Sequence, residues 1–103
     1  MTDIEKLMLK VDEGKIALHY GEEAQLRQTQ EELMEWHEAI EEYLNGTGTF
    51  EHMSEEAADV SVMSDQFNLM FHCENDVNDI KRYKVARQLK RMEAEKWQHV
   101  KNV

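Results

Sequence analysis

Apolar residues recur every three or four positions along most of the chain, which is the spacing of one face of an α-helix. Four such segments follow one another, over residues 3–19, about 22–44, about 54–72 and about 79–100. No segment alternates apolar and polar residues as a half-buried strand does. The pattern therefore predicts an all-α protein, a four-helix protomer folded as an antiparallel helical bundle.

Local signals set the expected ends of these helices. The second segment stops at Asn45 and Gly46, a typical C-terminal signal. The third is expected to begin at Ser54, a good N-cap that two glutamates follow. The polar run from Asn75 to Asp79 predicts a turn before the fourth helix. Proline is absent and glycine occurs only four times, which favours long helices.

Length and composition limit the class of protein. A chain of 103 residues predicts one domain over residues 1–103 with a modest core, so oligomerisation is expected. The lone Cys73 cannot form an internal disulfide, and the N-terminus lacks the basic and apolar regions of a signal peptide. No apolar run reaches the roughly 20 residues that span a bilayer. We therefore expect a cytoplasmic protein without a membrane partner.

The charge is unevenly distributed. The formal net charge is −10, and residues 1–60 hold 16 acids against 4 bases. Residues 61–103 hold 6 acids and 8 bases, and every one of these bases lies at or after Lys81. Nucleic-acid binding requires a broad basic face, so it is not expected. The asymmetry instead suits a small polyanion held between a metal ion and a basic C-terminal helix.

Two acidic pairs are the candidate chemistry. Glu32 and Glu35 are spaced i, i+3, as are Glu56 and Asp59, so each pair shares one face of its helix. Four carboxylates from two packed helices would form a cage of hard oxygen ligands, which suits Mg²⁺ or Mn²⁺. A single string of this kind also occurs on solvated helices and coiled coils, so the combination of two pairs is the signal.

Helical phasing relates these acids to the packed face. At about 100° per residue, Glu56 falls within the apolar stripe of its helix and Asp59 at the edge. Glu32 borders the apolar stripe of the preceding helix, and Glu35 lies next to Gln28 on that flank. Buried carboxylates without a partner are costly, and a bound cation removes that cost.

The two pairs resemble the hallmark of the MazG-like all-α nucleoside triphosphate pyrophosphohydrolases, EExxE followed by ExxD. The strings Glu31–Glu35 and Glu56–Asp59 match in order and spacing, and the resemblance covers about residues 22–92. It implies Mg²⁺-dependent cleavage of a (d)NTP between the α- and β-phosphates, giving a (d)NMP and pyrophosphate. By position it implies that the metal ligands are Glu32, Glu35, Glu56 and Asp59. Glu32 and Glu35 are also candidates for orienting or deprotonating the attacking water.

The resemblance also points to residues for binding substrate. The family often carries Lys-x-Asn and then arginines in the last helix. Here Lys84 is followed by Val85 and Ala86 without the asparagine, while the arginines remain. The candidates for holding the nucleotide are Lys84, Arg87, Arg91, Gln25 and Gln28.

Two other classes compete with this interpretation. A di-iron carboxylate bundle requires Glu-x-x-His on two helices, and Glu95 and His99 are four residues apart with no second pair. A non-enzymatic acidic protein that mimics DNA or binds a partner protein agrees with the charge. Such a mimic needs exposed acids, whereas phasing assigns Glu56 to the apolar face.

Overall fold

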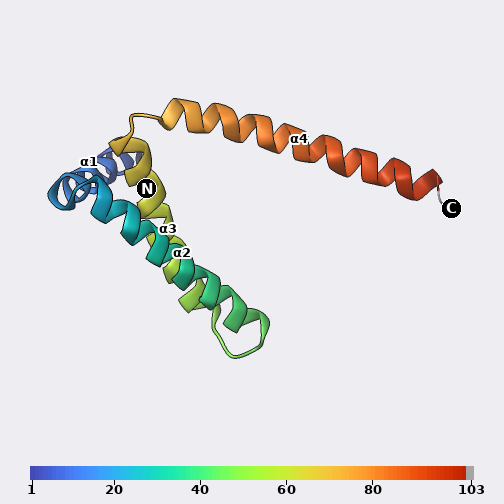
Figure 1. The fold of residues 1–103 in the computed structure, drawn as a ribbon, viewed down its shortest axis with the longest axis horizontal. Coiled ribbons are helices and arrows are strands. Elements are labelled where there is room, and N and C mark those ends of the chain that lie inside the picture. The colour runs from blue at the N-terminus through green and yellow to red at the C-terminus, as the bar shows by residue number, and fades with distance from the viewer. Residues whose placement is uncertain (102–103) are drawn as a thin grey trace. The chain divides into compact units, whose positions relative to one another are not determined.

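The computed structural model describes residues 1–101, with side chains through residue 99. These residues form helices and contain no strand. This confirms the all-α prediction. The helices are α1 (Asp3–Tyr20), α2 (Glu22–Leu44), α3 (Phe50–Met70) and α4 (Glu74–Lys101) (Figure 1). α1 to α3 form one compact unit, Met1–His72, and a second unit that begins at Cys73 contains α4. The single domain over residues 1–103, which extends beyond the described residues, stays a prediction.

Two helix starts differ from expectation. α3 begins before Ser54, because the hydroxyl of Thr49 accepts a hydrogen bond from the backbone N–H of His52 at 3.1 Å and acts as the N-cap. The polar run from Asn75 to Asp79 is not a turn and lies within α4, whose first turn holds Glu74 and Asp76. Acidic residues favour the positive end of the helix dipole, so such a run can open a helix.

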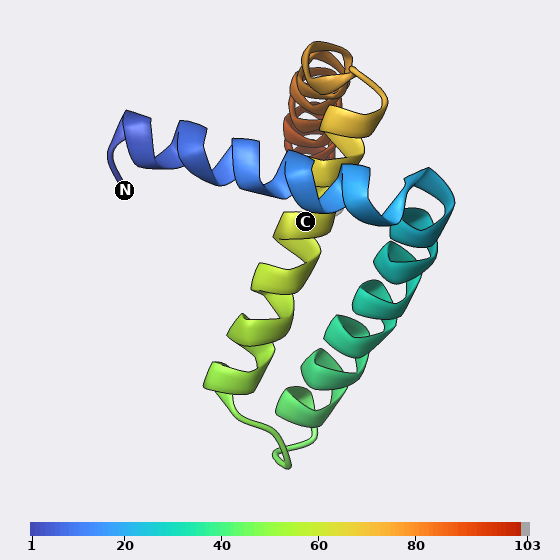
Figure 2. The same cartoon turned by 90° about the vertical axis from the view of Figure 1, so that its left-hand side faces the viewer.

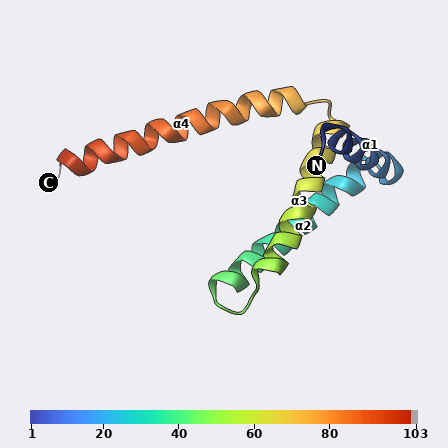
Figure 3. The same ribbon diagram turned by 180° about the vertical axis from the view of Figure 1, so that it is seen from behind.

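α2 and α3 form a helical hairpin, in which the two helices run antiparallel side by side (Figures 2 and 3). α2 ends at Leu44 with Asn45 as its C-cap, as expected, and Gly46 follows with φ of 79°. Gly48 then passes close to α2, so that a Cβ there would lie 2.8 Å from Cβ of Glu42 and 2.9 Å from the backbone N of Tyr43. The short loop therefore requires a glycine at position 48.

α1 crosses the end of this hairpin that is remote from its loop, and its N-terminal half extends past the hairpin (Figure 2). Gly21, with φ of 91°, makes the sharp turn between α1 and α2. Only Glu13 and Ala17 of α1 are buried. The apolar stripe of this helix stays exposed, as Leu7 at 63% and Leu18 at 87% illustrate.

The interior of the described residues is small and partly polar. Its buried apolar side chains are Ala17, Ala39 and Met63, and its buried polar side chains are Glu13, Gln25 and Gln66. Gln25 donates from Nε2 to Oε1 of Gln66 at 2.8 Å, and Gln66 donates to the backbone carbonyl of Glu13 at 3.1 Å. One buried amide chain thus connects α2, α3 and α1. Across the described residues, no helix combines the length and apolar character needed to cross a membrane.

Candidate metal centre

The α2–α3 hairpin brings the two acidic pairs together. Glu32 and Glu35 project from α2, and Glu56 and Asp59 project from α3. One carboxylate oxygen from each residue lies within 4.8 Å of the corresponding oxygens of the other three. We call this group the acidic cluster. Four negative charges at such separations repel one another unless a cation or protons neutralise them.

The two innermost carboxylates of the acidic cluster lack hydrogen-bond partners. The side chain of Glu56 is only 14% exposed, and Glu32 is half-buried. Oε2 of each residue is buried and accepts no hydrogen bond. An unpaired buried carboxylate oxygen costs several kcal/mol, roughly, unless a cation or a donor satisfies it. A cation, a proton or a hydrogen-bond donor would satisfy these two oxygens.

Neighbouring groups hold Glu32 in place and perturb its titration. Gln28, one turn earlier on α2, donates from Nε2 to Oε1 of Glu32 at 2.8 Å. This hydrogen bond acts to lower the pKa of Glu32, but burial and the negative charges of Asp59 and Glu35 outweigh it. The net effect raises the pKa of Glu32. The site therefore resists holding all its charges without a counter-ion.

His52 is a neighbour of the acidic cluster that the sequence reasoning did not select. It lies one turn before Glu56 on α3, and its Nδ1 is 4.0 Å from Oε1 of Glu56. The His52 side chain is 48% exposed, so solvent screens its interaction. The i, i+4 spacing of the two residues was the available signal, but it is common on helices.

The donor set fits a hard divalent cation. Opposite ligands of six-coordinate Mg²⁺ are separated by about 4 Å, close to the spread of these oxygens. All four donors are carboxylate oxygens, which Mg²⁺ and Mn²⁺ prefer over softer ligands. Glu35 and Asp59 are exposed, so the cluster has one side open to solvent.

The other predicted residues of α2 and α3 lie in distinct surroundings. Glu31 and Glu55 are exposed and outside the acidic cluster, as expected of solvated charges. Gln28 contacts the cluster through Glu32. Gln25 is 5% exposed and bonded to Gln66 in the interior, so its amide serves the packing of the helices.

The basic candidates all belong to α4, which is described on its own. Lys84, Arg87 and Arg91 are exposed and lie along one side of that helix. The guanidinium carbon of Arg87 is 5.7 Å from the ring centroid of Tyr83, a cation–π contact. α4 therefore presents a row of solvated cations.

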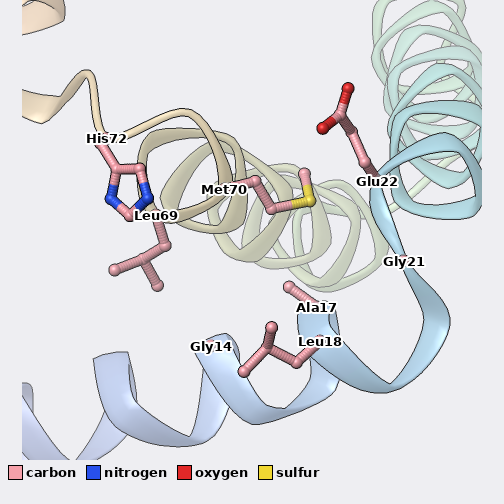
Figure 4. A pocket seen from close by; sticks show the side chains of 8 residues that line it. All are labelled: Gly14, Ala17, Leu18, Gly21, Glu22, Leu69, Met70 and His72. Atoms are coloured by element: carbon pink, nitrogen blue, oxygen red, sulfur yellow. The ribbon is translucent and has the colours of Figure 1, made fainter.

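A pocket of about 360 Å³ lies elsewhere in the α1–α3 unit and contains none of the clustered acids. Figure 4 shows apolar side chains of α1 and α3 facing each other across it, with Glu22 and His72 on opposite sides. The lining residues are Gly14, Ala17, Leu18, Gly21, Glu22, Leu69, Met70 and His72. This pocket is mainly apolar and offers no cage of ligands for a cation.

Sequence reasoning missed the buried polar residues at the α1 crossing. Glu13 and Gln66 gave no motif, and Glu13 is one of many glutamates in the chain. The available signal was the small residues that follow it, Gly14 and Ala17, which allow close approach of another helix. Their spacing marks the face of α1 that is buried.

Comparison with protein-family models, curated proteins and solved structures finds no match to this chain. Functional interpretation therefore depends on the chemistry of the acidic cluster and on the two acidic strings that define it.

Proposed function

We propose that the acidic cluster binds Mg²⁺, or Mn²⁺ in its place, and that the protein is a nucleoside triphosphate pyrophosphohydrolase. The observation that carries this proposal is the convergence of four carboxylates within 4.8 Å, two of them with buried oxygens that lack a partner. The type of reaction is taken from the resemblance of both acidic strings to the MazG-like pattern. The products would be a (d)NMP and pyrophosphate.

In this proposal all four residues of the cluster bind the cation, and two of them also act on the attacking water. Glu56 and Asp59 hold the cation from α3, and Glu32 and Glu35 hold it from α2. A bound divalent ion would neutralise phosphate charge and lower the pKa of a coordinated water. Glu35 is exposed on the open side of the cluster, so it is our first candidate to orient the attacking water or accept its proton. Glu32, fixed by Gln28, is the second.

Substrate binding is assigned to the basic residues of α4. A triphosphate carries several negative charges beyond those that a metal neutralises, and Lys or Arg side chains bind phosphate oxygens strongly. Lys84, Arg87 and Arg91 supply such cations, and the acidic α1–α3 unit supplies few. Gln28 remains a candidate for contacting the nucleotide beside the cluster. Gln25 is left out of the proposal because its side-chain Nε2 already donates a hydrogen bond to Gln66.

We also propose that the helices complete an antiparallel bundle in a homodimer or homotetramer. Large apolar side chains are exposed on every helix, including Met8 at 61%, Leu44 at 75%, Phe50 at 64% and Trp97 at 62%. A monomer rarely exposes that much apolar surface, and self-association would bury it. Light scattering of the purified protein tests this: a mass of two or four chains is expected, and a monomer at micromolar concentration contradicts it.

An acidic DNA mimic or partner-binding protein remains the competing function. The charge of −10 supports it, as do exposed acids on α2 such as Glu38, Glu41 and Glu42. A mimic uses acids that a partner can reach, whereas the side chain of Glu56 is only 14% exposed. A mimic would also gain nothing from Mg²⁺, whereas a metal enzyme would be stabilised against heat.

The reaction is tested by incubating the protein with Mg²⁺ and a panel of ribo- and deoxynucleoside triphosphates. Chromatography then separates (d)NMP and pyrophosphate, the expected products, from (d)NDP and phosphate. The Glu38→Gln variant, which removes an exposed acid outside the cluster, should keep full activity. No (d)NMP from any substrate, in Mg²⁺ or in Mn²⁺, would contradict the proposed enzyme.

A further inference from the structure

α1 packs on the hairpin through its more polar side. At about 100° per residue from Ile4, the buried residues Glu13 and Ala17 lie about 180° and 220° around the helix. Large apolar side chains occupy the opposite side, within about 60° of Ile4. Each is more than half exposed, and together they form what we call the α1 stripe: Ile4, Leu7, Met8, Val11 and Leu18. A contiguous exposed stripe of this kind marks an interaction surface.

The α1 stripe has the spacing of a helix that packs on another helix. Steps of three and four residues alternate along it, through Ile4, Leu7, Val11, Gly14 and Leu18. Apolar residues at such a heptad seam favour side-by-side pairing of two helices. α1 has 18 residues, which is about 27 Å of helix, and its N-terminal half extends past the hairpin (Figure 2). A second helix can therefore lie along its whole length.

The pocket between α1 and α3 continues the α1 stripe at its C-terminal end. Leu18 belongs to both the stripe and the pocket, and Leu69 and Met70 of α3 form the apolar wall beyond it (Figure 4). Gly14, which also lines the pocket, has no side chain to fill it. A helix that lies on the stripe would therefore meet a cavity of about 360 Å³ at this end, which an apolar side chain can enter.

Charge and symmetry favour a second copy of α1 in antiparallel orientation. The first turn of α1 contains Asp3 and Glu5, and its last turn contains His19. Lys15 also lies in the second half, 74% exposed beside Asp12. In an antiparallel pair, the acidic first turn of each helix lies beside the basic residues of the other, and the helix dipoles are also opposed. A parallel pair would instead place the acidic first turns together.

We propose that the α1 stripe is a dimer interface, which binds the α1 stripe of a second copy in antiparallel orientation. The two-fold axis passes at Val11, because Ile4 and Leu18 are each seven residues from it. Ile4 of the partner subunit then lies against Leu18 at the pocket, and symmetry repeats this contact at the other end. The proposal rests on the self-association proposed above and is independent of the proposed reaction.

The size of this interface predicts a reversible dimer. Burying a fully exposed aliphatic side chain removes roughly 60–120 Å² of apolar surface from water. The two stripes contribute ten side chains that are more than half exposed, so they cover several hundred square ångströms, roughly, of apolar surface. That is the range of small specific interfaces. We therefore expect the dimer to dissociate on dilution, which makes its dissociation constant measurable.

Two matched variants test the surface by sedimentation equilibrium. Leu7→Glu should raise the dissociation constant of the dimer roughly tenfold or more, because it places two unpaired charges in the interface. Leu9→Glu makes the same change on the same helix, about 140° around from Ile4 and outside the stripe, and should dissociate as the wild type does. An unchanged constant in Leu7→Glu, or an equal increase in both variants, would overturn the proposal.

Disulfide cross-linking tests the orientation without placing a charge in the interface. Chains with Ile4→Cys are mixed with chains with Leu18→Cys, both in a Cys73→Ser background, and treated with a mild thiol oxidant. Mixed-disulfide dimers should form, whereas Ile4→Cys alone should stay unlinked. In the antiparallel pair the two Ile4 positions are roughly 21 Å apart, and a disulfide requires Cα atoms within about 7 Å.

The remaining outcomes separate this proposal from the others. Cross-linking of Ile4→Cys alone would indicate a parallel pair and overturn the orientation. A dimer without mixed disulfides would place the interface elsewhere, overturning the α1 stripe as the interface but not self-association. A wild type that is monomeric throughout would overturn both, as expected if another part of the same chain covers the stripe. Release of (d)NMP is measured separately and is unaffected by any of these results.

Discussion

Gln28 donates its side-chain amide to Oε1 of Glu32 at 2.8 Å, across one turn of α2. This bond uses one oxygen of Glu32 and leaves the other, Oε2, buried and without a partner. Gln28 therefore fixes the carboxylate in the orientation that faces the acids of α3. Interactions of this kind behind a metal ligand contribute measurably to affinity, because they hold the ligand ready for the ion.

Replacing Gln28 by alanine should weaken Mg²⁺ or Mn²⁺ binding by roughly 10- to 100-fold. The four carboxylates remain, so binding is reduced and not abolished. Isothermal titration calorimetry measures the change. Gln30→Ala removes an exposed amide two residues away and should bind the ion as the wild type does. Equal affinity of the two variants would show that Gln28 does not organise the site.

Gln66→Leu should lower the free energy of unfolding by about 1–3 kcal/mol, because it leaves the buried Nε2 of Gln25 without an acceptor. Chemical denaturation measures the loss. The double variant Gln25→Leu, Gln66→Leu removes both partners and should recover part of the stability. If the free energy of unfolding of the double variant falls by the sum of the decreases in the two single variants, the two amides are not coupled as their geometry indicates.

Gly48→Ala should destabilise the helical hairpin by about 1–3 kcal/mol, since its Cβ would overlap the backbone of Tyr43 and Cβ of Glu42. Gly14→Ala is the matched substitution, in the interior of α1. Its Cβ would meet Leu69 at an ordinary 3.8 Å, and alanine favours helix by about 0.5–1 kcal/mol. Thermal denaturation should therefore give opposite shifts, and a lower melting temperature for both variants would contradict the packing described.

Lys84→Ala should raise KM for the nucleotide roughly tenfold or more, as expected for loss of a charged hydrogen bond to phosphate worth about 1.5–3 kcal/mol. The value of kcat should change little if the lysine binds the ground state and the transition state equally. Steady-state kinetics at saturating Mg²⁺ separate the two constants. Lys96→Ala, on the same helix, is the control, and an equal effect of both variants would remove the specific role of Lys84.

The helices were predictable because apolar periodicity reports a local geometry. Their starts were harder, since Thr49 and Ser54 are both competent caps and the chain uses the earlier one. The acidic cluster was predictable because a short loop after Asn45 returns α3 along α2. The helical spacing within each pair then directs Glu32 and Glu56 toward a shared face.

Burial of Glu13 could not be read from the sequence. The apolar stripe of α1 suggested a different packed face, and Leu7 on that stripe is exposed. The contact that buries Glu13 depends on how α1 crosses α3, which is a tertiary property with no local signal beyond Gly14 and Ala17. Buried polar residues at such crossings are determined by shape and not by hydrophobic pattern.

Binding of Mn²⁺, followed by electron paramagnetic resonance of the free ion, tests the central claim most directly because it needs no substrate. The wild-type protein should bind Mn²⁺ and release it to excess Mg²⁺. Glu56→Gln should lose this binding, and should be more stable than the wild type without metal because a buried charge is gone. Glu31→Gln, outside the acidic cluster, should bind normally. Equal Mn²⁺ binding by the wild type and both variants, or none by any of them, would contradict a metal centre at these carboxylates.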